Sequence, residues 1–117
     1  MRSLFWMGSS QENVKAFPEE VRRQIGFALY LAQSGEKHRD AKPLKGFGGA
    51  SVLEIVEDFE TDTYRAVYTV RLRSGVYVLH AFQKKSKHGI KTSKRDLDLI
   101  AQRLKEAIRY DEQRTEN

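Results

Sequence analysis

Three segments rich in β-branched and aromatic residues constrain the fold of this 117-residue chain more than any other feature. They are residues 52–59, 64–73 and 76–83, and the turn-forming sequences TDT and SG separate them. Such residues favour extended backbone, and short polar turns between extended segments are typical of antiparallel hairpins. The middle of the chain is therefore predicted to form a three-stranded antiparallel meander.

Helical patterns flank the meander on both sides. Pro18 suits the first position of a helix, and an apolar stripe at helical spacing follows it. This stripe consists of Val21, Ile25, Ala28, Leu29 and Ala32. Ser93 and Asp96 have the spacing of a helix cap, and a second stripe begins after them. It consists of Leu97, Ile100, Ala101, Leu104 and Ile108. A short strand is expected at 3–7 and a polar, glycine-rich loop at 38–49.

The length suits a single domain, which we place at residues 1–110, followed by a polar tail at 111–117. The sequence contains no cysteine, which excludes disulfides, thiolate chemistry and zinc sites of the cysteine type. No apolar run approaches the roughly 20 residues that cross a bilayer, and the apolar part of the N-terminus is too short for a signal peptide. We therefore expect a cytoplasmic protein without a membrane partner.

Positive charge is concentrated in one part of the chain. The net charge is +5, yet no Asp or Glu occurs between Asp62 and Asp96. This stretch holds nine basic residues: Arg65, Arg71, Arg73, Lys84, Lys85, Lys87, Lys91, Lys94 and Arg95. Because the rest of the chain carries 12 basic and 16 acidic residues, the acid-free stretch is predicted to bind an anion.

The alternation of side chains along the second and third strands predicts which of them share a face. If Ser74 and Gly75 form a two-residue hairpin loop, Lys84 lies directly opposite Arg65. Val78, His80 and Phe82 then share the arginine face, and Tyr77, Leu79 and Ala81 share the core face. Two facing cations destabilise a sheet unless an anion binds between them. Two alternatives stay open: a loop longer by one residue would bring Lys85 to this position, and the basic face could be solvated and paired with acids of the last helix.

This basic face favours RNA chemistry over metal-dependent cleavage. A nuclease with two divalent metal ions needs carboxylates to hold them, and the predicted face carries none. RNA can instead be cut by its own 2′-hydroxyl, which needs a base, cations near the phosphorane and an acid for the leaving oxygen. Arginine suits the phosphate because its guanidinium donates bidentate hydrogen bonds, and a lysine crowded by cations can act as a base. No metal or cofactor is expected.

The three histidines differ in what their surroundings predict. His38 lies in a polar loop and is expected to be exposed. His80 either contacts substrate from the basic face or is a partly buried, hydrogen-bonded strand residue. His88 lies in a lysine-rich loop, where a role in catalysis or RNA contact and a solvated position are equally open. Lys45 precedes the glycines of GFGG, which lack the P-loop pattern, so only its charge points to a role.

Four segments together resemble a known family. They are LKGFGG at 44–49, TYRAVYTV at 63–70, VYVLHAFQKKSKHGIKT at 76–92 and SKRDLDLIAQRLKE at 93–106. They resemble the phage-derived branch of the RelE/HigB toxins of bacterial toxin–antitoxin systems. The resemblance implies a small α+β fold, with N-terminal helices and a C-terminal helix packed on one face of a curved, mostly antiparallel sheet of about four strands.

The resemblance also implies an activity and its partners. It implies an mRNA endonuclease that acts in the ribosomal decoding site without metal and is silenced by an antitoxin, often one with a helix-turn-helix domain. Arg65 would act at the scissile phosphate, and Lys84 and Lys85 would form the basic pair after the last strand. A ParE-type gyrase inhibitor with the same fold, or a non-catalytic nucleic-acid-binding module such as a degenerate toxin, is the alternative.

Two features of the better-known relatives have no counterpart. Glu54 stands in the first meander strand, where they carry lysines, and no tyrosine lies near Lys91. We expect His80, His88 and Lys85 to substitute for the missing base and stacking residue, with His88 as the candidate acid. The predicted catalytic residues are thus Arg65, Lys84, Lys85 and His88. The predicted RNA contacts are Lys45, Arg71, Arg73, His80, Lys87 and Lys91.

Overall fold

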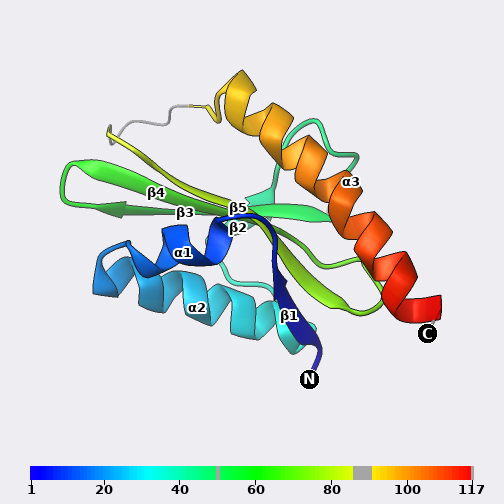
Figure 1. The fold of residues 1–117 in the computed structure, drawn as a ribbon. Coiled ribbons are helices and arrows are strands. Elements are labelled where there is room, and N and C mark those ends of the chain that lie inside the picture. The colour runs from blue at the N-terminus through cyan, green and yellow to red at the C-terminus, as the bar shows by residue number, and fades with distance from the viewer. Residues whose placement is uncertain (50, 86–90, 117) are drawn as a thin grey trace.

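The computed structural model describes residues 1–49, 51–85 and 91–116, which form a five-stranded sheet and three helices (Figure 1). The elements in chain order are β1 (Ser3–Trp6), α1 (Ser10–Lys15), α2 (Glu19–Gln33), β2 (Ala41–Pro43), β3 (Val52–Phe59), β4 (Asp62–Thr69), β5 (Gly75–Lys84) and α3 (Lys94–Glu116). The α+β class is confirmed, as are the meander of β3, β4 and β5 and the two predicted helical stripes. Among the described helices, none is long and apolar enough to cross a membrane.

The sheet is mixed and mostly antiparallel, with the strand order β1-β5-β4-β3-β2. β1 runs parallel to β5, and the other neighbours are antiparallel. The expectation of about four strands misses β2, which lies within the segment predicted to be a loop. Pro43 argues against a strand inside a sheet, but β2 is an edge strand, where proline is tolerated.

Helices cover both faces of the sheet, with α1 and α2 on one side and α3 on the other (Figure 1). Ala66 and Tyr68 of β4 pack with the buried stripe of α2, whereas Val67, between them in sequence, packs with Ile100 of α3. The implied placement of all helices on one face is therefore wrong. A strand buried on both faces needs an apolar layer on each side, and β4 is buried from Thr63 onward.

The helix predictions agree with the structure in most details. Every residue of the predicted α2 stripe is buried. In α3, Ile100 is buried, but Ala107 takes the place in the core that the pattern gave to Ile108, which is 39% exposed. Ser93 caps α3 as predicted, because its Oγ accepts a hydrogen bond from the backbone N–H of Asp96 at 3.2 Å.

The pairing of β4 with β5 differs from the predicted register. Arg65 pairs with Phe82, and Lys84 pairs with Thr63, so the predicted pairing of Lys84 with Arg65 is wrong. Two features cause the difference. The connection between the strands is longer than two residues, because β4 already ends at Thr69 while β5 begins at Gly75, and a β-bulge next to Val67 shifts the pairing.

The changed register redistributes the side chains of β5. Val78 packs on the α2 face, whereas Tyr77 and Leu79 pack on the α3 face, which reverses the prediction for these three residues. Beyond the bulge the prediction holds, because Phe82 packs on the α3 face and Ala81 on the α2 face.

The loop between β4 and β5 is fixed by Asp111 of α3. The Asp111 carboxylate accepts hydrogen bonds from the N–H groups of Arg73 (2.9 Å) and Ser74 (2.7 Å) and from the Tyr77 hydroxyl (3.3 Å). Burial alone would raise the pKa of Asp111, but these hydrogen bonds outweigh it and lower the pKa. The helix therefore does not end near Tyr110 but continues to Glu116, through the segment predicted to be a polar tail.

The substitution Asp111→Ala is expected to lower the free energy of unfolding by about 2 kcal/mol, because the N–H groups of the loop lose a charged acceptor. Urea denaturation measures this loss. The neighbouring variant Glu112→Ala, at an exposed position, is the matched control and should stay within roughly 0.5 kcal/mol of the parent. Equal stabilities of the two variants would contradict the role of Asp111.

Candidate functional site

Arg65 lies at the centre of the basic site, on the α3 face of β4. Its side chain is only 8% exposed, and that of Glu54, on the neighbouring strand β3, is 13% exposed. Arg65 Nη1 lies 3.5 Å from Glu54 Oε1 and 3.3 Å from Thr92 Oγ1, and Thr92 Oγ1 donates to Glu54 Oε2 at 2.7 Å. The guanidinium is thus held by a carboxylate from the neighbouring strand and by a hydroxyl from the segment that leads into α3.

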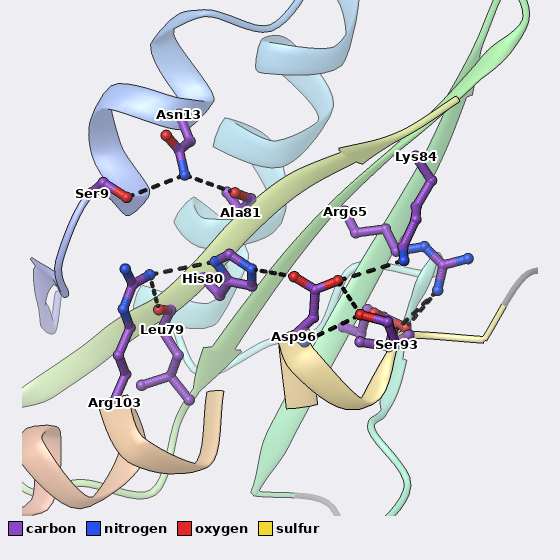
Figure 2. Close-up of polar contacts among 12 residues, drawn as sticks. Ser9, Asn13, Arg65, Leu79, His80, Ala81, Lys84, Ser93, Asp96 and Arg103 are labelled. Atoms are coloured by element: carbon purple, nitrogen blue, oxygen red, sulfur yellow. Dashed lines mark hydrogen bonds and ion pairs between the residues drawn. The ribbon is translucent and has the colours of Figure 1, made fainter. Parts of the chain in front are cut away.

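A second polar network lies beside Arg65 and joins β5 to the start of α3 (Figure 2). Asp96 is its centre: Oδ1 lies 2.9 Å from His80 Nε2, and Oδ2 lies 3.5 Å from Lys84 Nζ. Ser93 Oγ donates to Asp96 Oδ2 at 2.7 Å. On the other side of the imidazole, Arg103 Nη1 donates to the Leu79 carbonyl at 3.0 Å and lies 3.4 Å from His80 Nδ1. The network holds Lys84 above the sheet, next to the Arg65 site.

The protonation of this network follows from burial and charge. Burial lowers the pKa of His80, and the Arg103 charge adds to this, while Asp96 acts in the opposite direction without reversing the shift. Burial alone would raise the pKa of Asp96, but hydrogen bonds from His80 and Ser93 and the charge of Lys84 lower it. His80 is therefore a buried neutral imidazole bound to an ionised carboxylate, and the network already uses both of its ring nitrogens.

Acid is expected to destabilise the protein through His80. An unfolded imidazole takes up a proton below its ordinary pKa of 6.5, whereas the folded one resists protonation. The stabilising contribution is therefore present above pH 6.5 and is lost as the pH falls through the lower folded-state pKa. Thermal melts of His80→Gln should show a smaller fall in melting temperature on acidification than those of the parent. An equal fall in the two proteins would contradict this account.

A pocket of about 450 Å³ opens over Arg65, between β2 and the start of α3. The sheet contributes Glu54, Val56 and Arg65, and the apolar part of the wall comes from Pro43, Leu44 and Leu97. Three exposed lysines also line it: Lys42, Lys45 and Lys91. The structure thus places Lys45 and Lys91, two of the predicted RNA contacts, in one pocket with Arg65, and adds Lys42, which the sequence reasoning missed.

The other predicted site residues lie in three different places. Lys84 belongs to the Asp96 network, and Lys85 is exposed directly after β5. Arg71 and Arg73 lie beyond the far end of β4, roughly 20 Å along the strand from Arg65, so the structure does not bring them to the pocket. Lys87 and His88 lie outside the described residues.

Glu54 and Asp96 correct the expectation that the basic face carries no carboxylate. Asp96 borders the acid-free stretch and Glu54 lies on the strand before it, and folding places both beside its cations. The sequence does contain one sign that Glu54 lies beside Arg65. If residues 60 and 61 form the turn between the first two strands, Val56 pairs with Arg65, and Glu54 is then a diagonal cross-strand neighbour of Arg65 on the same face.

The groups that could hold a metal ion lie on the opposite face of the sheet. Within the described residues, a cluster of three potential ligands occurs at His38, Asp40 and Glu57. His38, expected to be exposed, is only 3% exposed, because Phe27 of α2 packs against its ring and Gln24 Oε1 accepts a hydrogen bond from its Nε2.

Comparison with known proteins gives one match. The model of the family "Phage derived protein Gp49-like (DUF891)" matches residues 12–105. The chain belongs to this Gp49-like family. It is a family of RelE/ParE-type toxins, which act as the toxin modules of toxin–antitoxin systems and have an antitoxin as partner. Neither the curated proteins nor the solved structures that were searched gave a match.

The matched region of the Gp49-like protein contains the whole candidate site. Glu54, Arg65, Lys84 and Asp96 all lie within it, as do the described residues that line the pocket. Strand β1 and the last part of α3, which includes Asp111, lie outside the match.

Proposed function

We propose that this Gp49-like protein is a toxin that cleaves mRNA on the ribosome, using the 2′-hydroxyl of the RNA as the nucleophile. The observation that carries the proposal is the pairing of Arg65 with Glu54 in a pocket lined by three lysines. A carboxylate can accept a proton, and a guanidinium can stabilise a developing phosphorane, so this pair supplies two of the three groups that the reaction needs.

The pocket suits one nucleotide of a single-stranded RNA. Its volume of about 450 Å³ lies within the range of small-molecule sites. Leu97 and Pro43 offer apolar surface to the flat face of a base. Lys42, Lys45 and Lys91 supply the positive charge that attracts the phosphates on either side.

In the proposed reaction Glu54 takes the proton of the 2′-hydroxyl. The 2′-oxygen then forms a bond to phosphorus while the bond to the 5′-oxygen breaks, and Arg65 stabilises the negative charge on the phosphoryl oxygens. Lys84, Lys85 or His88 gives a proton to the leaving 5′-oxygen. The products are a 2′,3′-cyclic phosphate and a 5′-hydroxyl. Glu54 thus takes the base role for which the sequence suggested a lysine or a histidine.

The pairing of the carboxylates supports a reaction without metal. Two-metal nucleases need carboxylates that converge on the ions. Here Glu54 contacts Arg65, and Asp96 contacts Lys84 and His80, so each acid is paired with basic groups. This arrangement favours proton transfer and electrostatic stabilisation.

The partners of this function follow from its place in a toxin–antitoxin system. We propose that a neighbouring gene encodes the antitoxin, with a helix-turn-helix domain, and that toxin and antitoxin meet in the cytoplasm. The ribosome would present the mRNA, because a shallow pocket for one nucleotide needs a scaffold that holds the rest of the strand.

Induced expression in bacteria followed by mapping of mRNA 5′ ends tests the proposal. Growth arrest with cuts at a fixed position within codons is the expected result. Intact mRNA with DNA damage would overturn it in favour of a gyrase inhibitor. Normal growth with intact mRNA would overturn it in favour of a non-catalytic binding module.

A further inference from the structure

Glu54, Arg65 and Lys84 form a diagonal row on the α3 face of the sheet. On β3, Val56 pairs with Arg65, so Glu54 is a diagonal neighbour of Arg65, and the two side chains meet at 3.5 Å. On β5, Lys84 pairs with Thr63, so Lys84 is the diagonal neighbour on the other side, displaced in the opposite direction along the strands. The candidate base and an ammonium group therefore flank the guanidinium on opposite sides.

This row matches the geometry of an in-line attack on phosphorus. The entering 2′-oxygen and the leaving 5′-oxygen lie on opposite sides of the phosphorus atom in such a reaction. Glu54 lines the pocket proposed for the nucleotide that carries the 2′-hydroxyl, whereas Lys84 is not part of the pocket wall. Lys84 lies on the side toward β5, where the RNA would continue beyond the scissile phosphate. Its side chain is 22% exposed, so a leaving oxygen can reach the ammonium group.

Asp96 fixes the ammonium group of Lys84 from one side. Asp96 Oδ2 lies 3.5 Å from Lys84 Nζ and accepts the Ser93 hydroxyl at 2.7 Å, while Oδ1 lies 2.9 Å from His80 Nε2 (Figure 2). A lysine side chain is long and flexible, and free rotation would spread its ammonium group over many positions. The carboxylate removes much of that freedom, because His80 and Ser93 hold its own two oxygens.

His80 is fixed in turn by groups on its other sides. Its ring stacks on Phe82 with 4.7 Å between the ring centroids, and Arg103 Nη1 lies 3.4 Å from its Nδ1. Gly8 leaves the space for this guanidinium, because a Cβ atom at Gly8 would lie 2.6 Å from Arg103 Cζ. The connection between β1 and α1, strand β5 and helix α3 thus all support the position of Asp96.

The segment that leads into α3 joins this network to the candidate base. Thr92 Oγ1 donates to Glu54 Oε2, and Ser93 Oγ, next in sequence, donates to Asp96 Oδ2, both at 2.7 Å. A network that only anchored α3 to the sheet would need the contact between Asp96 and His80 alone. Two adjacent residues instead hold the acids on both sides of the guanidinium, which favours a role in the geometry of cleavage.

We propose that Lys84 is the general acid of the cleavage reaction and that Asp96 is a positioning residue that holds it in place. The assignment rests on the proposed function and names one proton donor among the three candidate residues. The 2′-oxygen gives its proton to Glu54 and forms a bond to phosphorus, the bond from phosphorus to the 5′-oxygen breaks, and Lys84 gives that oxygen a proton. Lys84 is then a neutral amine and Glu54 a carboxylic acid, and proton exchange with water restores both.

RNA with sulfur in place of the leaving 5′-oxygen at the scissile phosphate tests the proposal, because a thiolate is a weak base that leaves without a proton. With ordinary RNA on ribosomes, single-turnover cleavage should be about 10²- to 10⁴-fold slower in Lys84→Met. It should be about 10²-fold slower in Asp96→Asn, in which an amide can still accept from His80 but turns its NH₂ group toward Lys84. With the sulfur-containing RNA both variants should cleave at nearly the parent rate. Glu54→Gln should stay slow on both RNAs, because sulfur does not replace the base.

Asp98→Asn is the matched control for Asp96→Asn. Asp98 lies on the same helix, and its side chain is 69% exposed and pairs with Lys94. The control should cleave both RNAs at the parent rate. Thermal melts show that each variant folds, and Lys84→Met, at a partly exposed position, carries the test even where Asp96→Asn melts early. A purely structural role of Asp96 would slow the cleavage of both RNAs equally.

Three outcomes would overturn the assignment while the proposed function stands. They are parent-like cleavage of ordinary RNA by Lys84→Met, no gain from sulfur in Lys84→Met and Asp96→Asn, and a gain from sulfur in Lys85→Met that Lys84→Met does not show. A parent protein that cleaves neither RNA would overturn the proposed function and this assignment together.

Discussion

The substitution Glu54→Gln is expected to slow RNA cleavage by about 10²- to 10⁴-fold, because an amide cannot take the proton of the 2′-hydroxyl. The change keeps the shape of the side chain, and the amide oxygen can still accept the Thr92 hydroxyl, which now donates to Glu54 Oε2 at 2.7 Å. Single-turnover cleavage of a ribosome-bound mRNA measures the effect.

Asp58→Asn is the matched control for this loss. Asp58 lies on the same strand as Glu54, is exposed and does not line the pocket. Its substitution should leave the rate of cleavage at the parent value. A Glu54→Gln protein that is folded and cleaves at the parent rate would show that the base is another residue.

The substitution Arg65→Met should abolish toxicity and also lower the free energy of unfolding by about 3 kcal/mol, since Glu54 then keeps a nearly buried charge without its guanidinium partner. Loss of the phosphorane-stabilising group alone should cost about 10²- to 10³-fold in the rate of cleavage. Growth assays and urea denaturation measure the two effects.

The double variant Arg65→Met/Glu54→Gln separates catalysis from folding. Removing both charges should restore most of the stability lost in Arg65→Met, because no unpaired charge remains. Cleavage should stay absent. A double variant as unstable as Arg65→Met would contradict the ion pair, and cleavage by either protein would contradict the role of Arg65.

The local patterns in the sequence predicted the elements of the fold well. The α2 stripe is buried as a unit, and the three strands of the meander lie where the β-branched and aromatic segments placed them. These features depend on neighbours within a few residues, which is why periodicity finds them.

The register between β4 and β5 could not be predicted in this way. It depends on the loop that Asp111 holds, and Asp111 lies 37 positions from Ser74 in the chain. It also depends on the bulge next to Val67, for which the sequence carries no clear sign. The partner of Arg65 is therefore Phe82 instead of Lys84, and on the other side of the bulge Tyr77, Val78 and Leu79 lie on the faces opposite to those predicted.

The sequence predicted only part of the candidate site, because residues that are distant in sequence meet there in the folded protein. Arg65, Lys45 and Lys91, which were chosen for their charge, line one pocket. Glu54 and Asp96 were missed because a stretch without acids in sequence need not be without acids in space. Glu54 lies on the neighbouring strand β3 and Asp96 at the start of α3, and the fold brings both to the cations of the stretch.

The chemistry of the RNA ends tests the central claim most directly. RNA is isolated after cleavage by the parent protein on ribosomes, and the ends at each cut are identified by their reactivity toward ligase and kinase. Attack by the 2′-hydroxyl predicts a 2′,3′-cyclic phosphate on one fragment and a 5′-hydroxyl on the other. Intact mRNA, or fragments with a 3′-hydroxyl and a 5′-phosphate, would contradict the account.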